Sequence, residues 1–312
     1  MTGKFWVGTY LSTVSILFLL TYIFIIFAEE YYPLRISENV AFDAKIRFLK
    51  DSKRLRSSDT IVVGSSMGLI NLNGEVLEKK SKSIIQLTNI SAWGDQVLQT
   101  EQILQLIEDS DVKYVIFPIQ MSEFSFDKKY DVDFDELKKY INDKFTLHLY
   151  NKVFLNMFSF LKAFYNYKSF HMVENTYPSL LFDKTGGISY RIYGEDIDQE
   201  KWEDNRIFGL NMKNFVALER MAKTLTAKDI KFIVATTPLR LPLLVRSPEW
   251  KGQYNKFSNL MAEHATENGY HYLNLHQELL LNDAFFADSS HMNYEGSVIL
   301  SQRIAEYIDS IQ

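Results

Sequence analysis

The sequence predicts an α/β fold, a three-layer sandwich in which helices cover both faces of a parallel five-stranded sheet. Five short apolar runs, rich in β-branched and aromatic residues, are typical of buried parallel strands. Helical patterns separate most of these runs, which favours parallel pairing with crossover helices, as in flavodoxin-like folds. The predicted strands are 59–64, 83–87, 113–119, 231–237 and 270–275.

Composition narrows the class of protein. The chain has 312 residues, which fits one large or two small domains, and 46% hydrophobic with 23% charged residues is globular composition. A net charge of −5, from 34 basic and 39 acidic residues, argues against nucleic acid as the main partner. The chain has no cysteine, which excludes disulfides, thiolate metal sites and cysteine nucleophiles.

The N-terminus predicts a membrane anchor at residues 5–28. These 24 residues carry no charge and would form a helix about 36 Å long, enough to cross a ~30 Å hydrocarbon layer. A signal peptide is the alternative, but its apolar region would be shorter, and Ile26-Phe27-Ala28 is a poor cleavage site. Lys4 alone precedes the span, so we expect everything after residue 30 to lie outside. With no second stretch of this kind, the remainder should be a tethered soluble domain.

The elements that follow the anchor are predicted in chain order. Residues 29–58 should form a stalk and a first packing helix at 41–49, and residues 59–312 should form one domain. Apolar residues at three- and four-residue intervals predict further helices at 97–107, 212–225 and 297–308.

A long connection predicts an inserted subdomain. About 110 residues separate the third and fourth strands, where a crossover of about 30 would suffice. We therefore place a helical insertion at about 125–210. Its segment 145–170 is crowded with Phe, Leu and Tyr, which indicates either a helix buried against the sheet or a helix that meets the membrane surface or a partner.

Polar residues after the strands are the candidates for chemistry, because open α/β sheets bind ligands at the carboxyl ends of their strands. Gly64-Ser65-Ser66 follows the first strand, either as an exposed nucleophile or as an ordinary turn. Asp288 and His291, spaced Asp-x-x-His before the last helix, could supply a general base and the carboxylate that orients it. A surface histidine is the alternative.

Other positions offer weaker signals. Gly94, after the second strand, could donate a backbone N–H to an oxyanion, or the segment could be a turn in which Asp95 caps the next helix. Arg240 follows the fourth strand and could meet an anionic polymer or lie in solvent. His271 and His276 are five apart across a strand and do not suit a metal pair. Because no glycine-rich phosphate loop or carboxylate cluster occurs either, we predict no metal and no cofactor.

These motifs, in this order, resemble the SGNH, or GDSL-like, hydrolase and acyltransferase superfamily. The Gly-Ser-Ser sequence points to its membrane-anchored branch, which is similar to the D-alanine transfer proteins of teichoic acid and the alginate O-acetylation proteins of bacterial envelopes. The resemblance covers roughly 59–125 and 229–310. Its most specific part is His291-Met292-Asn293-Tyr294-Glu295-Gly296.

The resemblance assigns roles by position. Ser66 corresponds to the nucleophile and, through its amide, to an oxyanion donor; Gly94 corresponds to the second oxyanion donor. Asp288 and His291 correspond to the C-terminal pair of the triad.

The chain departs from the family pattern in two places. Ser65 stands where the family usually has Asp, which leaves open which serine attacks. After the third strand there is no Gly-x-Asn-Asp, so the side-chain oxyanion donor is missing, and Gln120 or Ser122 are the candidates to replace it. Losing one such donor costs on the order of 2.7–4 kcal/mol, which would slow hydrolysis and favour an acyltransferase.

The resemblance implies membrane-tethered, serine-dependent acyl transfer, with O-acetyl expected, to a cell-envelope polysaccharide through an acyl-serine intermediate. The domain would lie on the outer side of the bacterial cytoplasmic membrane as a single-pass protein, with the acyl donor supplied by a polytopic membrane acyltransferase. One alternative is a carbohydrate esterase that deacetylates the same polymers. Others are a weakly catalytic or non-catalytic partner of such an acyltransferase and a tethered binding domain.

Overall fold

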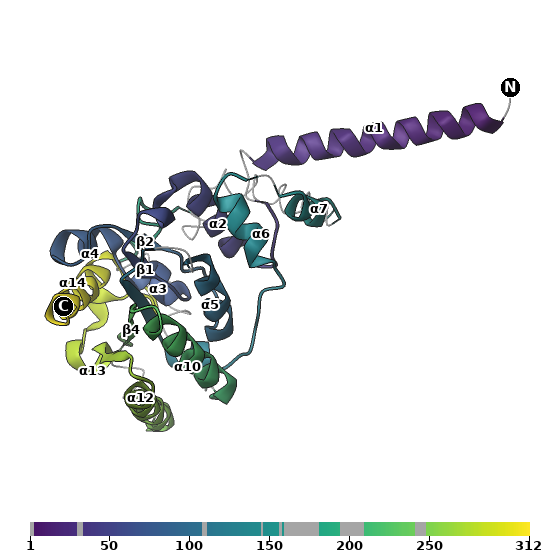
Figure 1. Ribbon diagram of the computed structural model, residues 1–312. Coiled ribbons are helices and arrows are strands. Elements are labelled where there is room, and N and C mark those ends of the chain that lie inside the picture. Colours follow the sequence, from purple (N-terminus) through teal and green to yellow (C-terminus); the bar gives the residue numbers. More distant parts are fainter. Residues whose placement is uncertain are drawn as a thin grey trace.

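The core of the protein is a parallel five-stranded sheet (Figure 1). The computed structural model describes residues 3–29, 34–107, 111–144, 146–155, 158, 181–193, 209–240 and 248–312. The strand order β2-β1-β3-β4-β5 is that of flavodoxin-like folds, which confirms the predicted fold class. The strands are β1 (Thr60–Val62), β2 (Leu87–Asn89), β3 (Tyr114–Ile119), β4 (Lys231–Thr236) and β5 (His271–Asn274).

Helices cover both faces of the sheet. Alternate residues of each strand point to opposite sides, so one strand contributes side chains to two apolar clusters. In β4, Phe232 and Val234 join one apolar cluster, whereas Ile233 and Ala235 join another. The first cluster includes residues of α2 (Val40–Ser52), α5 (Val97–Ile103), α6 (Phe134–Ile141), α10 (Met212–Thr226) and α12 (Pro248–Asn268). The second includes residues of α4 (Gly74–Lys80), α13 (Leu275–Leu279) and α14 (Tyr294–Ser310).

Strand β2 begins at Leu87, whereas the apolar pattern predicted a strand over 83–87. Two carboxylates explain the difference, since they accept backbone N–H groups that a strand would use for its ladder. Asp309 accepts from Ser83 N at 3.1 Å, and Asp59 accepts from Ile85 N at 3.0 Å. The predicted position was therefore wrong by four residues, although the strand exists.

Capping side chains set two helix starts differently from the prediction. The N-cap residue of helix α5 is Gln96, not Asp95, and the backbone N–H of Gln96 donates to Gln99 Oε1 at 3.0 Å in a capping box. Asp95 is buried and bonded elsewhere, so the interpretation of Asp95 as a helix cap was wrong. Helix α14 begins three residues before the predicted 297, because the side chain of Asn293 accepts from Gly296 N.

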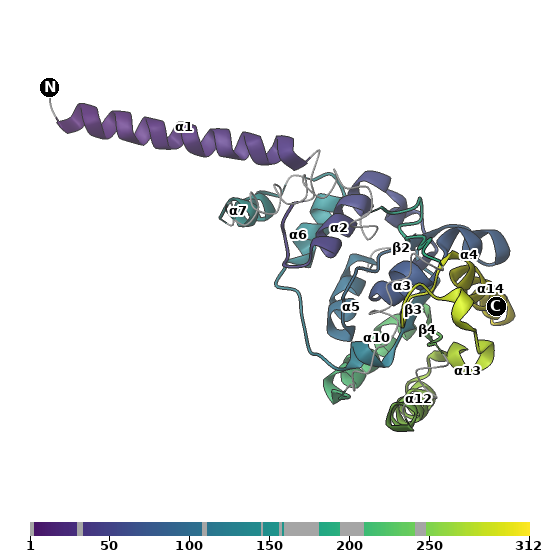
Figure 2. The ribbon, with the colours of Figure 1, turned by 180° about the vertical axis from the view of Figure 1, so that it is seen from behind.

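The N-terminal helix α1 (Gly3–Glu29) projects from the domain (Figures 1 and 2). Its stretch Trp6–Phe27 is long and apolar enough to cross a membrane by length and composition. Within the predicted insertion, the structure describes α6, α7 (Leu147–Leu155) and residues 181–193. Most of the aromatic segment 145–170 lies outside the described residues; the part that is described, α7, is a helix with one face in the core.

Candidate active site

All the predicted site residues except Arg240 meet at the carboxyl end of the sheet. Strand β1 is flanked by β2 on one side and β3 on the other. The connection from β1 to β2 therefore runs toward one edge of the sheet, and the connection from β2 to β3 runs back past β1 toward the other edge. Such a switch point opens a crevice between the loops, where α/β proteins bind ligands. Ser66 follows β1, Gly94 follows β2 and Gln120 follows β3, and all three line one cavity of about 320 Å³.

A tight turn presents Ser66. Gly64 has a φ of +128°, a conformation that favours glycine, and a Cβ at this position would lie 3.1 Å from the ring of Phe117. Ser65 then caps helix α3 (Ser66–Asn71), its Oγ accepting from Met67 N at 3.1 Å. Ser66 therefore occupies the first position of the helix, where its backbone N–H has no acceptor within the helix.

Ser66, His291 and Asp288 form one hydrogen-bonded chain. Ser66 Oγ lies 2.8 Å from His291 Nε2, and His291 Nδ1 lies 2.6 Å from Asp288 Oδ2. The other carboxylate oxygen of Asp288 accepts the backbone N–H groups of Ser290 at 2.9 Å and His291 at 2.7 Å. This is the arrangement of nucleophile, base and orienting carboxylate that serine acyl transfer requires. Of the two serines, Ser66 has its Oγ beside the imidazole, whereas the Oγ of Ser65 caps α3.

The environment of Asp288 keeps its carboxylate ionised. Burial works against the charge, but hydrogen bonds from the His291 ring and from two backbone amides outweigh it and lower the pKa of Asp288 below its ordinary value. With His291 Nδ1–H donating to the ionised Asp288, Nε2 is the ring nitrogen left to accept a hydrogen bond from the Ser66 hydroxyl.

Two aromatic residues enclose the imidazole. Trp93 stacks on the His291 ring with centroids 5.0 Å apart, and Tyr190 meets the ring edge-on at 6.3 Å. In the sequence, Gly186-Gly187 with Tyr190 and Arg191 predicts either a lid over the serine or a plain turn, so Tyr190 alone of these two aromatic residues had an expected place near the site. Trp93 was missed, although its place beside Gly94 was a usable signal.

Asn71 holds the histidine loop against the helix that carries Ser66. Its Nδ2 donates to Ser290 O at 3.1 Å, and its Oδ1 accepts from Met292 N at 2.8 Å. These contacts flank His291 on both sides, and Asn71 is fully buried. Sequence reasoning missed this residue, because nothing in a single asparagine late in a short helix signals a partner 221 residues away.

The oxyanion candidates share the cavity but differ in their surroundings. Gly94 has a φ of +80°, which favours glycine, and its loop is held by Asn39, which donates to Trp93 O at 2.8 Å. Gln120 donates one side-chain N–H to Ser290 O at 3.2 Å, and a carboxamide has a second N–H left. Ser122 also lines the cavity.

Beneath the Gly94 loop lies a buried polar cluster. Asp95 accepts from Asn39 at 3.1 Å and from the Tyr130 hydroxyl. Burial raises the pKa of Asp95 well above its ordinary value, against the opposing effect of these hydrogen bonds. The cluster connects the start of α2, the first helix after α1, to the loop that presents Gly94.

Glu123 adds a buried carboxyl to the cavity wall. It accepts from Gln120 N, and burial raises its pKa from 4.5 to about 8 despite the hydrogen bonds from Ser65 and Gln120 that favour its charge. At neutral pH the group is therefore mostly protonated, which keeps negative charge away from the candidate nucleophile.

Arg240 is not brought to this site. Its guanidinium is 2% exposed and forms a two-pronged ion pair with Asp283, at 3.1 and 2.8 Å, and it does not line the cavity. The alternative of an arginine in solvent is therefore wrong, whereas the polymer contact stays a prediction. Among the described residues, no group of three or more His, Asp or Glu side chains is placed to hold a metal ion.

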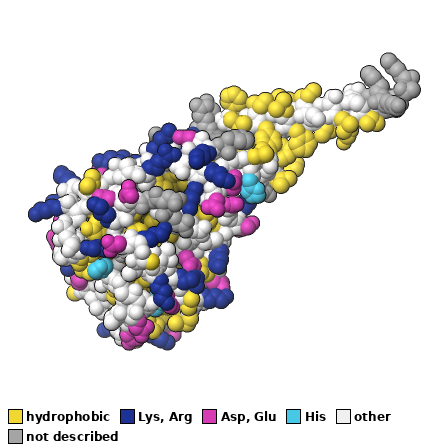
Figure 3. Space-filling model, in the orientation of Figure 1, with side chains coloured by type: hydrophobic (Ala, Val, Ile, Leu, Met, Phe, Trp, Pro, Cys, Tyr) yellow, Lys and Arg dark blue, Asp and Glu magenta, His cyan; other side chains and the backbone are white. Residues whose placement is uncertain are grey.

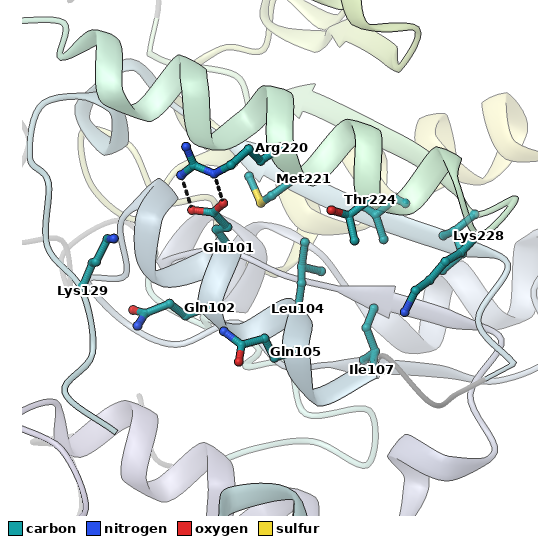
Figure 4. Close-up of a pocket in the computed structure, with 12 residues that line it drawn as sticks. Glu101, Gln102, Leu104, Gln105, Ile107, Lys129, Arg220, Met221, Thr224 and Lys228 are labelled. Atoms are coloured by element: carbon teal, nitrogen blue, oxygen red, sulfur yellow. Dashed lines mark hydrogen bonds and ion pairs between the residues drawn. The ribbon is translucent and has the colours of Figure 1, made fainter. Parts of the chain in front are cut away.

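A larger cavity of about 650 Å³ lies away from the site, between α10 and the end of α5 (Figure 4). Its lining includes Ile107, Lys228 and Ile230, which precede β3 and β4, so it faces the amino ends of the strands. Glu101 and Arg220 form an ion pair across it (Figure 4). None of the predicted site residues lines it.

Comparisons with known proteins found distant similarities. No family model matches the sequence, and no curated protein matches it. A presumed acylhydrolase from Bacteroides fragilis aligns with a TM-score of 0.43 and 11% identity, over 85% of this chain and 95% of its own. A catalytic mutant of an acetylxylan esterase from Geobacillus stearothermophilus aligns with a TM-score of 0.39 and 11% identity, over 80% and 94%. Another acetyl xylan esterase gives 0.39 and 14%, over 81% and 98%.

Proposed function

We propose that the chain is a membrane-anchored serine acyltransferase that moves an acyl group, acetyl being the expected one, to a hydroxyl of a cell-envelope polysaccharide. The observation that carries this proposal is the 2.8 Å approach of Ser66 Oγ to His291 Nε2, with Asp288 on the other ring nitrogen. The apolar helix α1 supports the tether, and the sequence resemblance supports the acceptor and an extracytoplasmic domain.

The mechanism has two matched halves. His291 Nε2 takes the hydroxyl proton of Ser66 as Oγ bonds to the acyl carbon of the donor; the donor C–O bond then breaks, and His291 returns the proton to the leaving oxygen. In the second half His291 deprotonates the acceptor hydroxyl, which attacks the acyl carbon. The bond to Ser66 Oγ breaks, and Oγ recovers its proton.

Negative charge on the tetrahedral oxygen would be met by backbone N–H groups of Ser66 and Gly94. A further donor would come from the side-chain amide of Gln120, whose second N–H is left after its bond to Ser290 O. Asp288 stabilises the imidazolium formed in each half and holds the ring in the productive tautomer.

Transfer and hydrolysis share this machinery, so the test measures both. The full chain in detergent is given p-nitrophenyl acetate and an oligosaccharide acceptor, and acetylated oligosaccharide is compared with free acetate. We expect acetylated product to exceed acetate. Acetate alone would indicate an esterase, and no release of p-nitrophenol would indicate a non-catalytic partner.

Matched variants separate the two serines. Ser66→Ala should abolish p-nitrophenol release. Ser65→Ala should retain release. It should lose the cap of α3, which costs about 1 kcal/mol of stability, together with the side-chain hydrogen bond to Glu123. Equal release from the wild type and Ser66→Ala would remove the proposed mechanism.

A further inference from the structure

Helix α7 packs directly on the apolar stretch of α1. The ring of Phe154 stacks on Phe18 at 4.9 Å and on Tyr22 at 5.1 Å, measured between centroids. The hydroxyl of Tyr22 also donates to Asn151 Oδ1. Figures 1 and 2, which show opposite sides of the molecule, both place α7 beside the domain end of α1.

These contacts lie well inside the candidate span Trp6–Phe27. Tyr22 and Phe18 are five and nine residues before Phe27, which is about 7.5 and 13.5 Å along a helix. Half of a ~30 Å hydrocarbon layer is about 15 Å. If α1 fills the bilayer with this stretch, Phe154 therefore lies at the depth of the domain-side leaflet.

The remaining surface of α7 suits that depth. Leu149 and Val153 are buried in the domain core, so the helix is fixed to the soluble part. In contrast, Leu155 is 82% exposed, and Phe158, three residues further along the chain, is 89% exposed. Hydrophobic side chains run along α1 and beside its base (Figure 3).

Two of the polar side chains of α7 are paired within the protein, whereas His148 is exposed. The one charged side chain of α7, Lys152, lies 3.6 Å from the carboxylate of Asp131 and also donates to the Asp131 carbonyl. Asn151 accepts from Tyr22, so its amide oxygen does not enter the leaflet unpaired. Long side chains that turn their polar ends back toward water are typical of helices at the membrane boundary.

We propose that α7 is a second membrane contact, which inserts Leu155 and Phe158 into the leaflet on the domain side, next to the anchor. The proposal rests on one part of the proposed function, which is that α1 spans a bilayer. The partner of this exposed surface is lipid, because the depth of the Phe18 and Tyr22 contacts places α7 in the hydrocarbon region. Anchored at both α1 and α7, the domain would hold its active site at a fixed orientation to the membrane.

The absence of cysteine from the chain makes a direct test available, since each introduced cysteine is unique. Leu155→Cys and Phe158→Cys are labelled with an environment-sensitive fluorophore in the full-length protein, reconstituted in phosphatidylcholine–phosphatidylglycerol vesicles. Lipids carrying a nitroxide on the upper acyl chain act as quenchers. Leu20→Cys, in the span, reports whether α1 is in the bilayer. Ile85→Cys, 79% exposed beside β2, is the matched exposed apolar control.

The proposal predicts that labels at 155 and 158 lose intensity to the same extent as the label at 20, whereas the label at 85 keeps its intensity. Quenching at 20 without quenching at 155 and 158 would overturn the proposal and leave the anchor intact. No quenching at 20 would overturn both the anchor and the membrane contact of α7. Shielding of 155 and 158 only when a multi-span membrane protein is added would assign this face to a protein and also overturn the proposal.

Discussion

At the scale of single residues, the site depends on side chains that hold other side chains. Ser66 and His291 are 225 residues apart in the sequence, yet their side chains approach to 2.8 Å. This approach requires that helix α3, which carries Ser66, is held against the loop that carries His291. Asn71 makes that connection with two hydrogen bonds around His291. We regard it as a positioning residue, since it touches neither reacting atom.

Asn71→Ala should therefore lower kcat more than it raises KM, because the histidine loop loses its fixed distance to Ser66. It should also cost about 1–3 kcal/mol of stability, since Met292 N is left buried without a partner. Turnover of p-nitrophenyl acetate and thermal unfolding measure the two effects. Asn73→Ala is the control: it removes the cap of α4, at a cost of about 1 kcal/mol, and should leave kcat unchanged. An unchanged kcat in Asn71→Ala would contradict the positioning role.

The buried carboxyl of Glu123 predicts a pH dependence of stability. Its folded-state pKa of about 8 lies above its ordinary value of 4.5, so between these values the folded state binds more protons than the unfolded state. Stability must then fall as pH rises from about 4.5 to about 8 and stay lower above that range. Glu123→Gln keeps an acceptor for Gln120 N and removes the titration.

We expect Glu123→Gln to become more stable relative to the wild type as pH rises, by on the order of a few kcal/mol at pH 9 and little at pH 4, since each pKa unit corresponds to about 1.4 kcal/mol. Denaturant unfolding of both proteins at pH 4, 7 and 9 measures this difference. A difference that does not change with pH would show that Glu123 titrates normally.

At the scale of elements, the start of α2 supports the loop that carries Gly94. Asn39 caps α2 by accepting from Ala41 N at 3.0 Å, and its amide donates to Trp93 O at 2.8 Å. One side chain therefore fixes a helix end and the backbone of the candidate oxyanion loop.

Asn39→Ser separates these two tasks, because a serine hydroxyl can cap a helix but is too short to replace the donated bond to Trp93 O. We expect the rate to fall roughly tenfold or more, within the ~10²–10³ loss seen when an oxyanion donor is removed outright. Asn211→Ser, the same change at the cap of α10, should leave the rate unchanged. Equal rates for both variants would refute the coupling of α2 to the Gly94 loop.

Element identity was largely predictable, whereas element boundaries were not. The five strands could be predicted from apolar runs between helical patterns, because a parallel strand covered on both faces needs apolar residues on both sides. The start of β2 could not be predicted, because it depends on carboxylates of Asp59 and Asp309 that approach from elsewhere in the chain. The same reason explains Arg240, whose partner Asp283 lies 43 residues away.

At the scale of the whole molecule, the triad was predictable because its residue types are few and their order along the chain is informative. The residues that support it, Asn71, Trp93 and Glu123, were not, since common residue types give no local signal and act through contacts distant in sequence. The packing of α7 on α1 is of the same kind, joining positions 129 residues apart.

The junction between α1 and the domain predicts that the anchor contributes to stability. Ile25 is fully buried in the main core cluster, and Tyr22 packs against it. Deleting residues 2–29 should therefore lower the free energy of unfolding by about 1.5–3 kcal/mol for Ile25 alone. Deleting residues 2–12, whose described apolar side chains are exposed, should have little effect in the same detergent. Equal unfolding midpoints for both deletions would show that α1 is only a tether.

The central claim is that Ser66 attacks and His291 activates it. The most direct measurement is the reaction of the full chain with a fluorophosphonate, followed by mass spectrometry of the peptides. The account predicts one adduct, on Ser66, that is absent in Ser66→Ala and forms far more slowly in His291→Ala. An adduct on Ser65, or undiminished labelling of His291→Ala, would contradict it.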